Sequence, residues 1–347
     1  MRQNGYLRLF LLVILVLAVS ALPGFGQAAQ GRTPAPKTPA EFTAYTAAYN
    51  EKDPAKKAEL AEKFITEFKD SELLSGAYSM VISGSMNSKN WAKAMESADK
   101  VSALSGVDDK TKKFAYENAL MAANNENNID KVLSYGDKVL AMDPNNLNTL
   151  VTVSTAIPIK YPTNKDQLKI AADMAAKALA GLQPVLAQAS GEQKKQIALI
   201  DGTLHDVLGV VAYNNQDYMK SMQNYQTAIQ DNIKDDNAHF YLAYNYLALM
   251  AQASKAYQAA FKAETDAIAA KADQPTVDDL KARTAGTIEE LKKQQEKAID
   301  ELAIAAAIGG PYAQQARTEL QKQWTNKNSN TDGMDQFIAD KKGQLGQ

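Results

Sequence analysis

The stretch KVLAMDPNN, residues 138–146, decides the fold, because an apolar helical face runs directly into a segment that cannot stay helical. Val139, Leu140 and Met142 carry the apolar face. Pro144 then ends the helix, since proline has no backbone N–H and its ring clashes with the preceding turn. If the same event recurs at a fixed spacing, the chain is an array of repeats rather than one globular core.

The residues before this stretch have the pattern of two antiparallel helices joined by a tight polar turn. The first helix is expected to end at residues 124–127, where Asn127 suits the left-handed conformation that ends many helices. The second helix begins at Ile129 and places Val132 and Val139 on one face, three and ten residues later. We therefore expect a helix–turn–helix unit here.

The same unit recurs along the chain. In four copies the second helix has a large residue followed by smaller or β-branched residues three and ten positions later: Trp91, Ala94 and Val101; Ile129, Val132 and Val139; Leu168, Ala171 and Ala178; Tyr218, Ser221 and Ala228. The copy that contains Leu168 is lengthened by five residues, through Ile157-Pro158 and Tyr161-Pro162. Further along, His205 recurs as His239 and Leu208 as Leu242, each 34 residues later.

A helix–turn–helix period of 34 residues with this placement of large and small residues resembles the tetratricopeptide repeat (TPR) family. The segments HDVLGVVAYNNQDYMKSMQNYQTAI (205–229) and NIDKVLSYGDKVLAMDPNN (128–146) carry the resemblance most fully. Ile82 and Leu120 stand where the family favours glycine. With a first copy at 42–73, hinged at Lys52-Asp53-Pro54, about six helix pairs are expected. The resemblance implies an all-α, right-handed superhelical solenoid over residues 41–325.

The last repeat is expected to contain a long helical hairpin, inserted at about residues 250–297. Its first arm runs to residue 272 and is broken at Pro275, and Thr276 with Asp279 forms the expected capping box of the second arm. This hairpin either binds a partner or covers the exposed end of the stack. A last helix over 312–324 closes the array, with Tyr312, Ala316, Leu320 and Trp324 facing inward, and residues 326–347 form a C-terminal tail with a short amphipathic end.

The amino terminus has the pattern of a signal peptide, predicted to comprise residues 1–26. Arg2 and Arg8 come before residues 9–22, which carry no charge. This uncharged segment is shorter than the ~20 residues that a helix needs to span a bilayer. Cleavage is expected between residues 22 and 30, and a Pro-rich linker follows at 27–40. The expected location is the periplasm or the outside of the cell, and the alternative is an uncleaved anchor in the inner membrane.

Composition and motifs argue against several classes of function. The net charge is −2 with no basic cluster after the amino terminus, so nucleic acid is not an expected partner. The chain has no cysteine, and we find no nucleophile elbow, no phosphate-binding loop and no HExxH motif. We therefore expect no enzyme activity and no cofactor.

The two histidines, His205 and His239, occupy equivalent places in consecutive repeats. They could approach one metal ion, but only carboxylates such as Asp206 remain to complete four ligands. In the family this place holds a bulky packing residue, so packing is the preferred interpretation and no metal site is predicted.

The leading prediction is a non-catalytic scaffold that binds a protein or an extended peptide in the cell envelope. One alternative is a structural subunit of an envelope complex that docks through the long hairpin, and a weaker one is a hydrolase of envelope polymers, supported only by scattered carboxylates. The oligomeric state stays open. The resemblance implies a concave groove lined by the first helix of each pair, and its expected residues are Ser83, Met86, Asn87, Glu117, Met121, Asn124, Asn125, Tyr213, Asn214, Phe240 and Tyr244. Each of these can instead be ordinary surface, and the aromatic residues can pack between repeats.

Overall fold

The computed structural model describes residues 34–346, and within that range it contains fourteen α-helices and no strand. The prediction of an all-α chain is confirmed. The predicted signal peptide and residues 27–33 of the predicted linker lie outside the described residues. The chain divides into two compact units, one with α1–α7, up to Pro162, and the other with α8–α14, from Thr163.

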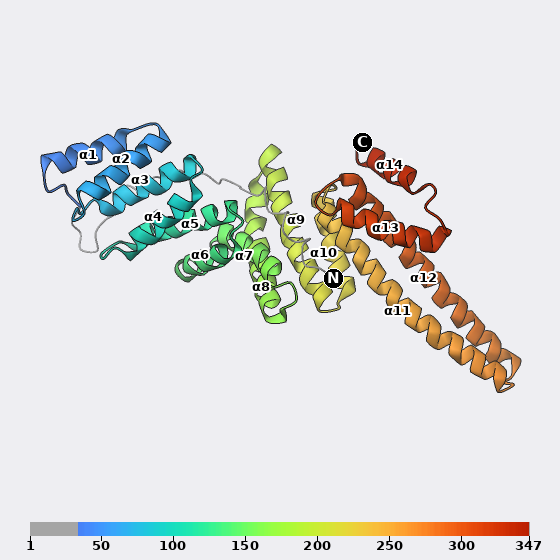
Figure 1. Cartoon of the computed structure of the whole chain (residues 1–347). Coiled ribbons are helices and arrows are strands. Elements are labelled where there is room, and N and C mark those ends of the chain that lie inside the picture. The colour runs from blue at the N-terminus through green and yellow to red at the C-terminus, as the bar shows by residue number, and fades with distance from the viewer. Residues whose placement is uncertain (1–33, 347) are drawn as a thin grey trace. The chain divides into compact units, whose positions relative to one another are not determined.

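The N-terminal unit is built of helices that pack on their neighbours in sequence. Each helix contacts the next one, and the first helices of successive pairs also meet, because α3 packs against both α1 and α5, and α5 against α7. This is the packing expected of stacked helix pairs. The helices are α1 (Pro39–Asn50), α2 (Pro54–Glu67), α3 (Leu74–Asn87), α4 (Trp91–Ala103), α5 (Asp109–Asn125), α6 (Ile129–Met142) and α7 (Leu147–Lys160) (Figure 1).

The C-terminal unit follows the same rule and adds a long hairpin. The two longest helices, α11 and α12, pack against each other along their length, and their distal part extends beyond the other helices of the unit (Figure 1). Helices α13 and α14 both pack on α12. The bounds are α8 (Lys165–Gln188), α9 (Gly191–Asn214), α10 (Tyr218–Asp231), α11 (Asp236–Ala269), α12 (Gln274–Ile308), α13 (Ala313–Asn328) and α14 (Met334–Leu345).

One turn geometry repeats within the helix pairs and explains where the first helices end. Lys89, Asn127 and Gln216 have positive φ angles of 59°, 54° and 63°. The residue after each is an N-cap (Asn90, Asn128 and Asp217), and its N–H donates to the carbonyl five residues earlier at 2.8–2.9 Å. This is the hydrogen-bond pattern of a left-handed helix end. The prediction for Asn127 is confirmed, and the equivalent positions in two other copies share it.

Small residues at the contacts let the paired helices approach closely. At Gly209 on α9 an added Cβ atom would lie 2.8 Å from the ring of Tyr225 on α10, which is fully buried. Such a contact is closer than packed carbon atoms tolerate, so only glycine fits beside this ring. The small residue at this position therefore lets α9 and α10 pack directly on each other.

Three details at the C-terminal end differ from the sequence predictions. The N-cap of α12 is Asp273, whose side chain accepts the N–H of Thr276, so the expected capping box of Thr276 and Asp279 is wrong. Helix α13 continues to Asn328, four residues beyond the predicted end, and ends where Ser329 takes the left-handed conformation with a φ angle of 64°. The predicted tail contains α14, which packs on α12 and buries Met334.

Helix α13 closes the C-terminal unit as predicted. Tyr312, Ala316 and Leu320 are buried in one cluster with residues of α11 and α12. The indole N–H of Trp324 donates to the carbonyl of Asp332 at 3.1 Å, and its ring lies 5.2 Å from that of Phe337 on α14. These contacts fix α14 against α13.

One described helix, α8, has the length and composition of a membrane span. It packs against α9, and Leu168, Ala175 and Leu182 are buried on one of its faces. Helix α8 therefore packs on α9 through one apolar face, and 22% of its apolar window is buried.

Candidate binding surface

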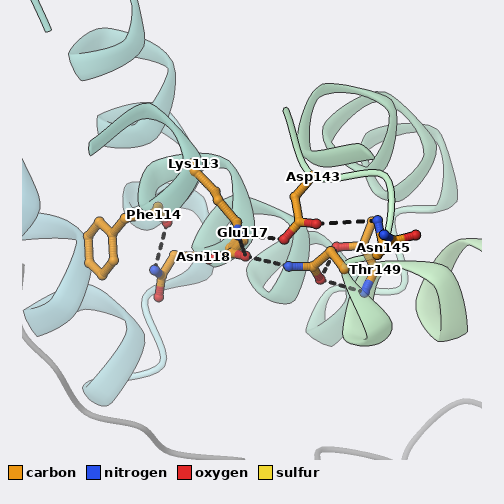
Figure 2. Close-up of polar contacts among 8 residues, drawn as sticks. Lys113, Phe114, Glu117, Asn118, Asp143, Asn145 and Thr149 are labelled. Carbon is orange, nitrogen blue, oxygen red and sulfur yellow. Dashed lines mark hydrogen bonds and ion pairs between the residues drawn. The ribbon is translucent and has the colours of Figure 1, made fainter. Parts of the chain in front are cut away.

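A polar cluster joins α5 to the turn between α6 and α7 in the N-terminal unit (Figure 2). The ammonium group of Lys113 lies 2.6 Å from Oδ2 of Asp143, and Nδ2 of Asn146 donates to Oε1 of Glu117 at 2.7 Å. Lys113 and Glu117 are one turn apart on α5, with 3.8 Å between their charged atoms. The DPNN segment, residues 143–146, is thus bound to α5 by an ion pair and a hydrogen bond.

The same segment also starts α7. Oδ1 of Asn146 accepts the N–H of Thr149 at 3.1 Å and its hydroxyl at 2.8 Å, which makes Asn146 the N-cap. Oδ1 of Asp143 accepts the N–H of Asn145 at 3.2 Å, a bond that holds the turn around Pro144. One short stretch therefore ends α6, begins α7 and anchors both to α5.

One base, Lys113, interacts with both acids of this cluster, Glu117 and Asp143. Burial raises the pKa of Glu117, and Lys113 and Asn146 oppose that rise. The hydrogen bond from Lys113 lowers the pKa of Asp143, and the same bond raises the pKa of Lys113. A carboxylate and an ammonium that already hold each other have little capacity to act on a substrate. We therefore assign the cluster to positioning of α7 against α5.

Glu117 also opens a stripe of predicted site residues along α5. Met121 and Asn124 follow it at positions i+4 and i+7, on the same helical face. Glu117 and Asn124 are half-buried, whereas Met121 is 40% exposed. The side-chain N–H of Asn125 donates to the carbonyl of Met121 at 2.8 Å, so this amide stabilises its own helix end. An exposed methionine therefore lies between polar side chains.

The neighbouring helix α3 carries the other predicted residues of this unit. Ser83 and Met86 are half-buried, and Asn87 is exposed at the end of the helix. Met86 packs against the core cluster that fills the space between α3, α4 and α5. Since α3 and α5 are in contact, the predicted residues of α3 and those of α5 lie on adjacent first helices.

The remaining predicted residues lie in the C-terminal unit, where packing accounts for the aromatic ones. Phe240 is 5% exposed, and its ring lies 4.9 Å from that of Tyr312 and 4.7 Å from that of Tyr244. The expectation that Phe240 lines an open groove is wrong, because Tyr312, just before α13, and residues of α12 pack against it. The ring of Tyr213 packs edge-on against Tyr218 at 5.6 Å, between α9 and α10.

Asn214 is half-buried at the end of α9. Its side-chain N–H donates to the carbonyl of Val210 at 2.9 Å. This amide serves the end of its own helix, as that of Asn125 does on α5. The four predicted residues of the C-terminal unit, Tyr213, Asn214, Phe240 and Tyr244, are thus half-buried or buried, whereas Met121 is exposed.

The sequence analysis did not anticipate a group of buried carboxyls between α9 and α11. Oδ2 of Asp206 accepts the side-chain N–H of Asn237 at 2.8 Å, and Oδ2 of Asp236 accepts the N–H of Tyr312 at 2.9 Å. Burial raises the pKa of Asp206 well above its usual range, and that of Asp235 and Asp236 less strongly. The signal in the sequence is Asp206, which directly follows His205 and lies on the buried side of a first helix.

These carboxyls do not strengthen the hydrolase alternative. Asp206 is 7% exposed and Asp236 is 6% exposed, so neither meets solvent or a polymer chain. Glycoside hydrolysis needs two carboxyls that reach the same bond from an open site. The buried group instead ties α9 and α11 to the start of α13.

Each histidine is held by protein groups. Nδ1 of His205 pairs with Oδ1 of Asn224 at 2.9 Å. Nδ1 of His239 pairs with Oε2 of Glu301 at 2.6 Å, and its Nε2 faces the carbonyl of Ile233 at 3.2 Å. Among residues 34–346 no group of three or more His, Asp or Glu side chains is arranged to hold a metal ion. The imidazoles link helices.

Comparison with known proteins gives a likeness in fold only. No family model matches the chain, and no curated protein matches it. A solved tetratricopeptide repeat protein from Parabacteroides merdae ATCC 43184 is similar in structure, with 12% sequence identity and a TM-score of 0.40. The match covers 82% of this chain and 98% of that chain. A likeness at this level carries no argument about ligand or role.

Proposed function

We propose that the protein is a non-catalytic scaffold of the cell envelope, and that it binds a partner protein or extended peptide on the first helices of its N-terminal unit. The observation that supports this most is the exposed Met121, placed on α5 between half-buried polar residues and beside α3. Methionine adapts its shape to different apolar groups, and neighbouring polar side chains can bind a peptide backbone.

The location in the envelope is part of the proposal and rests on the sequence of residues 1–26. An uncharged segment of signal-peptide length and a Pro-rich linker precede the helical part of the chain. Amino-terminal sequencing of the native protein tests this. We expect a start between residues 22 and 30, and an intact Met1 in a membrane fraction would contradict it.

The binding surface is tested by a pair of methionine substitutions. Met121→Asp places a charge in the proposed contact, and Met219→Asp changes a methionine on α10 that is 61% exposed. We expect Met121→Asp to abolish recovery of the partner from native envelopes, with an unchanged melting temperature. Met219→Asp should leave recovery unchanged. Equal recovery with both variants would contradict the proposal.

A second candidate function is that of a structural subunit that docks through the hairpin of α11 and α12. The observation in its favour is the exposure of Phe261 and Ile268, 51% and 50%, on the part that extends beyond the unit. Exposed apolar side chains that share one face of a helix favour contact with another surface. Deletion of residues 250–297 distinguishes the candidates, because it removes complex formation only if the hairpin is the docking element.

A further inference from the structure

The projecting part of the hairpin has an apolar flank on α11. Phe261 and Ile268 are 51% and 50% exposed, and the ring of Tyr257 stacks on that of Phe261 at 5.8 Å. These three residues are spaced by four and seven positions, which places them within one narrow face of a helix. Ile288 on α12 is also exposed, at 37%.

The hairpin closes without this flank. On α12 the residues that face inward along the hairpin include Val277 and Thr284, which are buried. Helix α13 reaches α12 only as far as Gln295, whose side chain donates to the carbonyl of Gln323, and Glu296, which pairs with Lys327. Between about residues 250 and 294 the hairpin therefore consists of its two arms alone (Figure 1). Its apolar flank has no cover within the described chain.

The charges of the hairpin are divided between its tip and its body. The tip, residues 264–280, has five acids and one base, 1 − 5 = −4: Glu264, Asp266, Lys271, Asp273, Asp278 and Asp279. The body, residues 250–263 and 281–297, has seven bases and three acids, 7 − 3 = +4: Lys255, Lys262, Lys281, Arg283, Glu289, Glu290, Lys292, Lys293, Glu296 and Lys297. Some of these charges form exposed pairs, such as Lys262 with Asp266, but the net charge of each region remains.

We propose that the hairpin is a dimerisation element, and that its occupant is the same hairpin of a second copy of this chain. The two hairpins lie flank to flank and antiparallel, so that each acidic tip meets the basic body of the other copy. A two-fold contact uses the same surface on both copies, so opposite net charges on one element make that surface complementary to itself in the antiparallel direction. A parallel pair would set tip against tip and body against body, with repulsion at both ends.

The apolar residues fit the same arrangement. The free first arm of the hairpin runs from about residue 250 to residue 271, and Phe261 lies eleven residues after its start and ten before its end. In an antiparallel pair the two-fold axis therefore passes close to Phe261. The two Phe261 rings then meet at the centre, and each Ile268 lies toward Tyr257 of the second copy. The free hairpin is about 33 Å long and about 20 Å wide, since a helix rises 1.5 Å per residue and is about 10 Å across. A face of that size is comparable with the ~800 Å² that each partner gives to a standard interface.

Single-cysteine crosslinking of the full chain tests this contact, because the natural sequence has no cysteine. Under mild oxidation we expect Phe261→Cys to form a disulfide-linked dimer at least about fivefold more than Ala259→Cys, since only residues with Cα atoms within about 7 Å can be bridged. Ala259 is exposed on the opposite face of α11 and is the matched control. Equal crosslinking at the two positions, or none at Phe261→Cys, would overturn the proposal.

The same method tests the antiparallel direction. A mixture of Tyr257→Cys and Ile268→Cys chains should give more linked dimer than either variant alone, because these positions meet only across the two copies. Strong crosslinking of Ile268→Cys with itself would indicate a parallel pair and would overturn the arrangement.

Charge reversal provides a second measurement. Lys292→Glu with Lys293→Glu should weaken dimer formation about tenfold at low salt, and adding Asp278→Lys with Asp279→Lys to the same chain should restore it. Unchanged dimer formation in both variants would overturn the charge argument. The inference does not rest on the proposed surface around Met121, and capture of a peptide there leaves it unaffected.

Discussion

Gly209 is the residue whose size matters most directly to the packing of a helix pair. An added Cβ atom would lie 2.8–2.9 Å from three atoms of the Tyr225 ring, and Tyr225 is fully buried. We expect Gly209→Ala to cost about 1–3 kcal/mol, the usual penalty of overpacking, and Gly209→Leu to cost no less. Chemical unfolding followed by circular dichroism measures the loss.

Gly286 is the matched control for this substitution. It lies inside α12, and a Cβ atom there would have no atom within 4 Å. Gly286→Ala should therefore stabilise the protein by about 0.5–1 kcal/mol, because alanine is the better helix former. A gain of stability at both glycines would show that helix propensity decides the outcome and that contact with Tyr225 imposes no cost.

Asp231 on α10 gives the stability a defined pH dependence. Burial, followed by the charge of Asp201, raises its pKa from 3.8 to about 6. The folded state therefore binds more protons than the unfolded state between about pH 4 and pH 6, and stability falls as the pH rises through this window. Since the carboxyl is partly exposed, we expect a loss of about 1 kcal/mol rather than the ~3 kcal/mol of the full shift.

The variant Asp231→Asn tests this sign. It removes the titrating group, so stability between pH 4 and pH 7 should vary less, and at pH 7 the variant should be at least as stable as the natural protein. Thermal melts at several pH values provide the measurement. An unchanged pH profile in the variant would place the effect on other carboxyls.

At the scale of one element, Asn146 combines two tasks that can be separated. It caps α7 through Thr149 and donates to Glu117 on α5, whereas Asn128 caps α6 through the N–H of Lys131. Asn128→Ala should cost about 1 kcal/mol, the value of a cap. Asn146→Ala should cost about 2 kcal/mol, because a half-buried carboxyl also loses a hydrogen bond. Equal losses would mean that the bond to Glu117 contributes nothing.

The aromatic residues of the C-terminal unit allow a test of packing against binding. The ring centroids of Tyr213 and Tyr218 lie 5.6 Å apart, and those of Tyr244 and Phe240 lie 4.7 Å apart. We expect the double variant Tyr213→Ala with Tyr244→Ala to melt several degrees lower while it keeps its partner, since a loss of 1 kcal/mol moves Tm by about 2–4 °C. An unchanged melt with lost capture would return these residues to the binding surface.

The elements were predictable where a local rule acts alone. The turn at Asn127 and the break at Pro144 depend on backbone conformation that the residue itself dictates, and both are as expected. The cap of α12 was not predicted, because Asp273 and Thr276 are both residue types that cap helices well. The local sequence does not decide between them, and the path of the backbone makes Asp273 the cap. The burial of Phe240 was not predicted either, since it depends on α13, which lies more than seventy residues further along the chain.

At the scale of the whole molecule, the repeat period predicts the class of fold and much of the core. Helices contact their neighbours in sequence, so a period in the sequence becomes a period in the packing. The candidate site is harder to predict, because a first-helix position is open only where no later helix covers it. Met121 remains exposed in the N-terminal unit, whereas the equivalent expectation fails for Phe240 in the C-terminal unit.

Site-specific photocrosslinking in the native envelope tests the central claim most directly. A photoreactive amino acid is placed at Met121, at Asn87 on the adjacent helix, and at Met219 as the exposed control. The proposed surface predicts that positions 121 and 87 link to the same protein or peptide and that position 219 does not. A partner that links to position 219 but to neither of the other two would contradict the account.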